Sequence, residues 1–225
     1  MTLGALRIAQ KDLNIELRTR ERMTSMILLS LVIVLSFRFA FFGFDVDLSE
    51  SPELVAPILW TTIFFAGVMG LESSFSYEKE NKYLDGLLLL PTSRYSIYLG
   101  KMLSNLLFLI AIDIATLIFV VAFFAYDPGG SFLALFGVVL LGTFSFVAMG
   151  TLVSGMTISA RARQALLQIA LIPLIVFTIV IPAVVATSKV VLGSGDLGPE
   201  LRILGGFGIL SLLLAYVLFG YLLEG

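Results

Sequence analysis

The chain has 225 residues, of which 59% are hydrophobic and only 13% are charged, and its mean hydropathy is +1.04. A soluble domain of this length needs more charge to cover its surface, so the composition predicts a membrane protein. The sequence contains no cysteine and no histidine. Disulfides, thiolate metal sites and cysteine nucleophiles are therefore excluded, and the usual zinc ligand, haem ligand and neutral-pH proton carrier are missing.

Residues 1–22 form a basic segment ahead of the first long apolar run. Leu3, Leu6, Leu13 and Leu17 recur at spacings that share one helical face, and the charged side chains fall largely elsewhere. This pattern predicts an amphipathic helix that lies in the headgroup layer with its apolar side down. The alternative is a basic flank that only sets topology. We do not expect a cleavable signal peptide, because the following apolar run is too long and no small-x-small site follows it.

Six apolar stretches of sufficient length predict transmembrane helices. They cover about residues 23–44, 54–75, 98–125, 131–158, 164–188 and 203–223. We therefore expect an all-α membrane protein with an interfacial helix over residues 1–22 and a six-helix transmembrane domain over residues 23–225. Glycine-rich turn residues separate the third span from the fourth and the fifth from the sixth.

Lys and Arg are distributed unequally between the two sides of the predicted bundle. With the N-terminus inside the cell, eleven of the fourteen lie on the cytoplasmic side, two lie outside, and Arg38 falls within the first span. The first outer loop carries only acidic charges, at Asp45, Asp47, Glu50 and Glu53. The positive-inside rule therefore predicts that both termini are cytoplasmic.

Arg38 and Asp113 are charged residues inside predicted spans, where charge is costly and suggests a function. Each lies 15 residues from the inner end of its span, at a depth of roughly 22 Å. The shared depth favours a salt bridge between spans one and three. One alternative is that Arg38 reaches outward alone while Asp113 meets a serine or water. Another is that Arg38 contacts an anionic substrate.

Other residues near the span ends have both structural and functional interpretations. Glu72 lies near the inner end of span two. It is either a headgroup-level boundary residue or a residue that anchors the start of the docking helix or meets Arg161 or Arg163. Pro173 and Pro182 lie in span five, and proline removes a backbone donor and kinks or softens a helix. A hinge at these prolines is a prediction, and ordinary helix packing is the plainer interpretation.

The longest cytoplasmic connection, about residues 76–97, is the most informative stretch. It is dense in charge, then rich in leucine, and then stopped by Pro91. Leu84, Leu87 and Leu88 share a helical face, which predicts a short amphipathic helix that ends near the proline. Such a helix suits docking into a groove on a partner. The alternative is a solvated loop that lies on the bilayer.

The sequence around this connection resembles the signature of the CcmB family of haem exporter permeases, which belong to the cytochrome c maturation system. The matching residues are Leu71-Glu72, Phe75, Glu78, Leu84-Asp85 and Leu89-Leu90-Pro91. A second match, similar to the family's fifth helix, consists of Arg161-x-Arg163, Leu171-Ile172-Pro173-Leu174 and a run that ends at Pro182. One departure is the run Lys79-Glu80-Asn81-Lys82, which is more mixed in charge than the acidic stretch of the family.

The resemblance implies the architecture of an ABC-2-type exporter permease. It implies a homodimer of this chain with two copies of a cytoplasmic ABC ATPase subunit, a separate haem-handling membrane subunit, and a location in the inner membrane. Haem would be the substrate of the complex. The sequence has no Gly-x-x-x-x-Gly-Lys-Ser/Thr phosphate loop, so ATP and Mg²⁺ would belong to the partner. We expect no enzyme activity, cofactor or metal in this chain by itself, and no nucleic-acid partner.

The connection is where the energy of ATP hydrolysis would enter. The residues expected to couple to the ATPase are Glu78, Lys82, Leu84, Asp85, Leu87, Leu88, Pro91 and Arg94. Another subunit would coordinate the iron, while this one would couple hydrolysis to haem delivery or to release of a haem-loaded chaperone. Alternatives are a similar permease that exports a lipid-linked glycan or a drug, an assembly factor without a transport path, and an intramembrane enzyme, whose usual motifs are missing.

Overall fold

A computed structural model describes residues 2–41, 51–80, 93–156 and 172–222. All regular elements in these ranges are helical. Six of the described helices are long and apolar enough to cross a membrane. These cover Glu21–Ala40, Pro52–Ser74, Tyr95–Phe124, Gly129–Gly155, Ile172–Val191 and Gly198–Leu218. The predicted all-α membrane fold, with six spans after an N-terminal helix, is confirmed.

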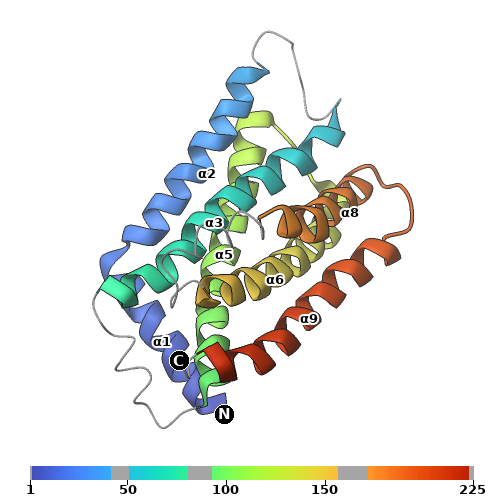
Figure 1. The fold of residues 1–225 in the computed structure, drawn as a ribbon. Coiled ribbons are helices and arrows are strands. Elements are labelled where there is room, and N and C mark those ends of the chain that lie inside the picture. The colour runs from blue at the N-terminus through green and yellow to red at the C-terminus, as the bar shows by residue number, and fades with distance from the viewer. Residues whose placement is uncertain (1, 42–50, 81–92, 157–171, 223–225) are drawn as a thin grey trace.

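The helices follow one another along the chain (Figure 1). Their bounds are α1 Thr2–Thr19, α2 Glu21–Ala40, α3 Val55–Glu80, α5 Arg94–Phe124, α6 Phe132–Met156, α8 Ile181–Val191 and α9 Gly198–Leu222. Short 3-10 turns η1 (Pro52–Leu54) and η2 (Gly129–Ser131) precede α3 and α6, and a π-helical turn η3 (Val176–Val180) precedes α8.

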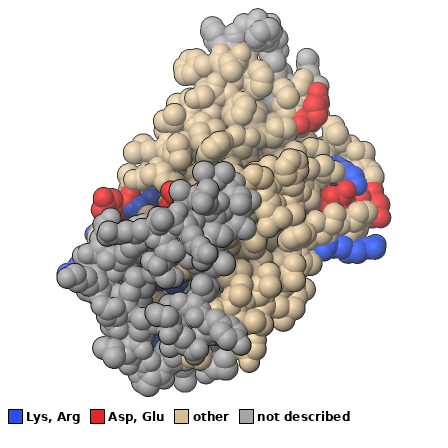
Figure 2. Space-filling model, in the orientation of Figure 1, with Lys and Arg blue, Asp and Glu red and all other residues tan. Residues whose placement is uncertain are grey.

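The bundle has two ends, and α1 marks one of them (Figure 1). We call this the α1 end: α2 and α5 begin there, and α3, α6 and α9 finish there. In the face drawn in Figure 2, charged side chains lie toward the margins, and a broad surface without charge separates them. This distribution fits an apolar belt around the middle of the bundle.

Helix α5 is the centre of the fold, because it packs against α1, α2, α3, α6 and α9. It has 31 residues and a length of roughly 46 Å at about 1.5 Å per residue, which exceeds the roughly 30 Å of a bilayer's hydrocarbon core. It begins at a capping serine, since the Oγ of Ser93 accepts a hydrogen bond from the Ser96 N–H at 3.3 Å. The extra length brings the first turns of α5 beside α1.

A large buried cluster holds the spans together. It includes Met26 of α2, Trp60 of α3, Leu109 of α5 and Phe146 of α6. The indole Nε1–H of Trp60 donates to Thr187 on α8 at 2.8 Å. This tryptophan lies directly against Gly142 of α6, where any larger side chain would collide with the indole ring.

The fifth span is irregular between its two prolines. Pro173 lies in the short helical stretch 172–175, and Pro182 lies in the first turn of α8. The π-helical turn Val176–Val180 separates them. Because proline has no N–H to donate within the helix, an irregular turn next to it has a local cause. Bending at this turn remains a prediction.

Candidate functional site at the α1 end

Helix α1 docks closely onto the first turns of α5. Ala5, Ile8 and Ala9 are buried. A Cβ atom added to Gly100 of α5 would lie 2.7 Å from the Ile8 Cβ and 2.8 Å from the Ala5 carbonyl oxygen. Such distances are too short for real contacts, so only glycine lets the two backbones approach this closely.

The opposite face of α1 is left uncovered by the described helices. Leu17 is 62% exposed and Leu6 is 54% exposed, and Arg7 and Arg18 are exposed beside them. The predicted helix is therefore confirmed, and part of its predicted apolar face is free to meet lipid. Its position in the headgroup layer stays a prediction.

A buried lysine joins three helices at this end. Lys101 of α5 is only 2% exposed, and its ammonium lies 2.9 Å from Oδ2 of Asp12 on α1. The same ammonium donates to the backbone carbonyl of Ser74 on α3 at 3.1 Å. Ser104 adds a hydrogen bond to Oδ2 of Asp12 at 3.3 Å. A buried ammonium is tolerated only with such partners, so Lys101 fixes α1 and α3 to α5.

A second set of polar contacts continues toward α6. Arg22 of α2 donates to the side-chain oxygen of Asn105 at 2.8 Å, and its guanidinium lies 4.5 Å from the centre of the Phe108 ring. The Asn105 amide donates in turn to the hydroxyl of Thr151 on α6 at 3.1 Å. Together with the contacts of Lys101, these links form a network across α1, α2, α3, α5 and α6, which we call the α1-end network.

The turn from α1 into α2 is fixed by a carboxylate of the same region. Arg20 has a left-handed backbone with φ 57°, which breaks the helix. Glu16 is buried and accepts a hydrogen bond from the N–H of Met23 at 2.8 Å. A carboxylate at a helix start satisfies an unpaired donor and complements the helix dipole. The angle between α1 and α2 is therefore set by a specific contact.

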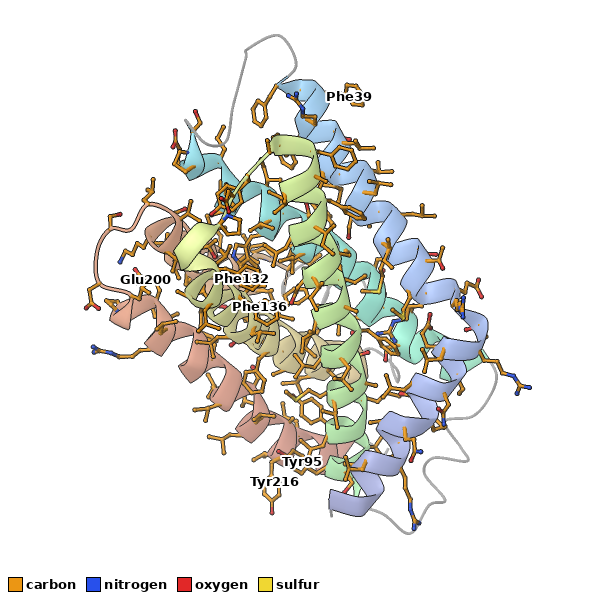
Figure 3. All side chains as sticks on the ribbon, turned by 180° about the vertical axis from the view of Figure 1, so that it is seen from behind. Phe39, Tyr95, Phe132, Phe136, Glu200 and Tyr216 are labelled. Carbon is orange, nitrogen blue, oxygen red and sulfur yellow. The ribbon has the colours of Figure 1, made fainter. Side chains whose placement is uncertain are left out.

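The α1-end network lies at both ends of the predicted coupling connection. Ser74 lies six residues before the end of α3, and Lys101 lies seven residues after the start of α5. Near the same start, Tyr95 packs edge-on against Tyr216 of α9 with ring centroids 5.2 Å apart (Figure 3). Both ends of the connection are therefore anchored beside contacts that join five packed helices and, through Tyr95, α9.

Most of the predicted coupling residues fall outside the described residues. These are Lys82, Leu84, Asp85, Leu87, Leu88 and Pro91. The same holds for Arg161 and Arg163, so their pairing with the exposed Glu72 stays a prediction. Glu78 belongs to the last turn of α3 and Arg94 begins α5, but the placement of these two side chains is likewise outside the description.

The predicted salt bridge between Arg38 and Asp113 is wrong. Arg38 lies with its guanidinium 5.9 Å from the centre of the Phe124 ring, and Asp113 accepts a hydrogen bond from Thr143 at 2.9 Å. Asp113 comes eleven residues before Phe124 on α5, a separation of roughly 16 Å along the helix. The alternative in which Asp113 meets a serine or water is nearer to the structure, because the partner is also a hydroxyl group, that of Thr143.

The physical reason is the offset between α2 and α5. Arg22 of α2 lies over Phe108 of α5, and Arg38 of α2 lies over Phe124 of α5. The two arginines are 16 residues apart on α2, and the two phenylalanines are 16 residues apart on α5. The two helices therefore run side by side in the same direction. Fourteen residues of α5, from 94 to 107, come before the level of Arg22. Counting depth from the start of each apolar run missed this offset.

Sequence reasoning did not single out the residues at the centre of the network. Lys101 was counted only as a cytoplasmic charge, and Asp12 and Asn105 were not considered as partners. A signal was present, because Lys101, Ser104 and Asn105 follow one another at i, i+3 and i+4 inside an apolar run and so share one face of a helix. That face meets α1 and α6.

Comparison with protein families gives a match over nearly the whole chain. Residues 3–223 match the CcmB protein family. The chain belongs to the CcmB family. CcmB is the membrane component of the haem exporter of cytochrome c maturation and works with the other components of that ABC transporter, among them the ATPase CcmA. The family and the six apolar helices indicate a multi-pass inner membrane protein. Comparison with curated proteins gives no match.

Proposed function

We propose that this CcmB chain couples ATP hydrolysis by its partner ATPase to haem delivery or to release of a haem-loaded chaperone. In this proposal both termini are cytoplasmic, the α1 end faces the cytoplasm, and two copies of the chain pair within the complex. The observation that carries the proposal is the buried contact of Lys101 with Asp12 and Ser74. It joins α3 and α5, the helices between which the coupling connection runs, to the N-terminal helix α1.

The ATPase docks on the connection of about residues 76–97 and moves it during the nucleotide cycle. Because the ends of that connection are tied through Lys101, α3 and α5 move together and take α1 with them. Separating the ammonium of Lys101 from the carboxylate of Asp12 would break an ion pair whose lysine is buried, which costs several kcal/mol. Helix α5 crosses the whole bundle, and it therefore carries the displacement to the opposite end.

The chain's composition supports a role in coupling rather than in iron chemistry. The sequence offers neither histidine nor cysteine, the side chains that most often hold haem iron along with methionine and tyrosine. A separate haem-handling membrane subunit would then coordinate the iron, and the ATPase would hold ATP and Mg²⁺. A purified chain that binds axially ligated haem in stoichiometric amount would contradict this division.

The test is to express the chain with CcmA and its other transporter components, purify the complex and follow two activities. Lys101→Met should leave nucleotide binding by the ATPase intact but lower haem-dependent cytochrome c maturation at least tenfold. The rate of ATP hydrolysis should then no longer depend on whether maturation takes place. The matched control is Lys189→Met, which removes a partly exposed lysine paired with Glu200 at the opposite end.

Three outcomes would count against parts of the proposal. Equal rates of cytochrome c maturation in Lys101→Met and Lys189→Met would contradict a coupling role for the α1-end network. Recovery of an ATPase without a haem-containing membrane partner would favour a permease that exports another substrate, such as a lipid-linked glycan or a drug. Recovery of neither partner would contradict the transporter assignment of this chain's complex.

A further inference from the structure

A carboxyl group lies deep in the bundle, away from the α1-end network. Asp113 of α5 has 0% of its surface exposed. Its Oδ2 accepts the hydrogen bond from Thr143 of α6. Its Oδ1 is buried and has no hydrogen-bond partner in the part of the chain that the structure describes. A buried carboxylate oxygen without a donor is costly, and such a group calls for an explanation.

A second buried group without a partner follows one turn later on the same helix. The hydroxyl oxygen of Thr116 makes no hydrogen bond to any described residue, and the side chain is fully buried. No hydrogen bond joins this hydroxyl to Asp113, so α5 carries two separate buried oxygens without a partner in the described ranges. A proton on Oδ1 would make Asp113 a neutral acid, which removes the cost of a buried charge.

The charged groups around Asp113 do not provide a counter-ion within the described ranges. On α2, Arg22 and Arg38 lie over Phe108 and Phe124, on either side of the level of Asp113. On α3, Glu72 lies two residues before Ser74, at the α1 end. The sequence of α6 contains no ionisable residue. On α9, Glu200 and Arg202 lie at the end opposite α1, and Tyr216 lies beside Tyr95 at the α1 end.

We propose that Asp113 is a proton-binding site, occupied in the packed state by a proton on Oδ1. An ionised carboxylate at this depth, without a cation, would cost several kcal/mol more than the neutral acid. The proton belongs to the contact between α5 and α6, because Thr143 of α6 holds the other carboxyl oxygen. This inference rests on the geometry of the bundle and is independent of the proposed coupling to ATP.

The position of the site links it to the packing of α5 against α6. These antiparallel helices share the side-chain contacts of Asn105 with Thr151 and of Asp113 with Thr143, besides the hydrogen bond that the Tyr98 hydroxyl donates to the Ala148 carbonyl. The two side-chain contacts are separated by eight residues on both helices, or roughly 12 Å. When the two helices separate, water reaches Asp113 and the carboxyl releases its proton. When they pack again, the carboxyl takes up a proton.

The experiment is infrared spectroscopy of the complete transporter complex in lipid nanodiscs, with CcmB in place and with H₂O exchanged for D₂O. A neutral carboxylic acid has a C=O stretching band that a carboxylate lacks. At neutral pH, Asp113→Asn should remove one carboxyl equivalent of that band. The control Asp127→Asn changes an exposed aspartate between α5 and α6 and should leave the acid band unchanged.

A second variant keeps the proton and removes the hydrogen bond to the other carboxyl oxygen. Thr143→Val removes the hydroxyl that donates to Oδ2 at nearly constant shape, so the acid band should remain and shift to higher frequency as that hydrogen bond is lost. This variant also serves if Asp113→Asn fails to assemble. Loss of carboxylate intensity instead of acid intensity in Asp113→Asn would overturn the proposal. An acid band that does not respond to Thr143→Val would overturn the assigned proton position.

A linked measurement is the pH dependence of thermal stability of the same complex. At neutral pH the packed state holds one proton that an exposed aspartate has already lost, since an exposed aspartate titrates at about pH 4, so stability should decrease as pH rises. Asp113→Asn, in which the amide NH₂ replaces the acid O–H as donor, should remove that component and flatten the curve. An unchanged slope would contradict proton binding at this site.

Discussion

Two side-chain hydrogen bonds between α5 and α6 use different chemistry at different depths. Asn105, near the α1 end, lies in a region where charges of both signs meet, among them Lys101 and Arg22 with Asp12 and Glu16. Asp113, eight residues further along α5, has one hydroxyl partner and no described counter-ion. The first region can tolerate ionised groups because each has a partner, whereas the second requires a neutral carboxyl.

The comparison indicates that the two ends of the α5–α6 contact respond to different signals. In the proposed function, the α1-end network responds to displacement of the neighbouring connection, and in the proposed proton site the Asp113 contact responds to access of water and protons. Helix α5 contributes residues to both contacts.

The largest effect should come from removing the cation of the α1-end network. Lys101→Met removes the shortest printed ion pair of Asp12 and leaves that carboxylate with Ser104 and with Lys11 at 3.1 Å. Loss of one member of a buried ion pair costs about 3 kcal/mol or more. We expect lower thermal stability and loss of protection of α1 from hydrogen exchange. The double variant Lys101→Met, Asp12→Leu should recover part of that stability; no recovery would mean that the two side chains are not coupled.

The next effect tests the close approach of α1 to α5. Gly100→Ala places a methyl group against Ile8 and the Ala5 carbonyl, and overpacking of this kind costs about 1–3 kcal/mol. Gly137→Ala is the control, because a Cβ at Gly137 of α6 would meet no atom within 4 Å. Proteolysis of the α1–α2 junction in membranes should increase only in the first variant. Equal rates in both would show that α1 does not depend on this contact.

A smaller pair of effects compares the two hydroxyl groups on α6. Thr143→Val leaves both oxygens of Asp113 without a described donor, at a cost of about 1–3 kcal/mol. Thr151→Val should cost about 0.5–1.5 kcal/mol, because Asn105 keeps its bond to Arg22. The measurement is the midpoint of thermal unfolding of the purified complex. A larger effect at Thr151 would reverse the ranking of the two contacts.

The sequence predicted the fold well because membrane spans depend on composition along one dimension. Six apolar runs and an amphipathic N-terminal segment suffice to predict seven helices, and the residues that resemble the CcmB signature predicted the family. The site was predicted less well, because a buried contact depends on the relative offset of helices. Lys101 and Asp12 are 89 residues apart, and no local pattern states that α1 lies beside the first turns of α5.

The smallest effect separates the sequence-based interpretation of Arg38 from the structure. If Arg38 formed a buried salt bridge with Asp113, Arg38→Gln would leave an unpaired carboxylate and cost about 3–5 kcal/mol. In the structure its described partner is the Phe124 ring at 5.9 Å, an interaction of about 0.5–1 kcal/mol near an exposed site. We therefore expect Arg38→Gln to shift the unfolding midpoint little and to leave the acid band of Asp113 in place. A large loss of stability that Asp113→Asn in the same chain rescues would instead support the salt bridge. It would also contradict the proton on Asp113, because a carboxyl group that pairs with arginine is ionised.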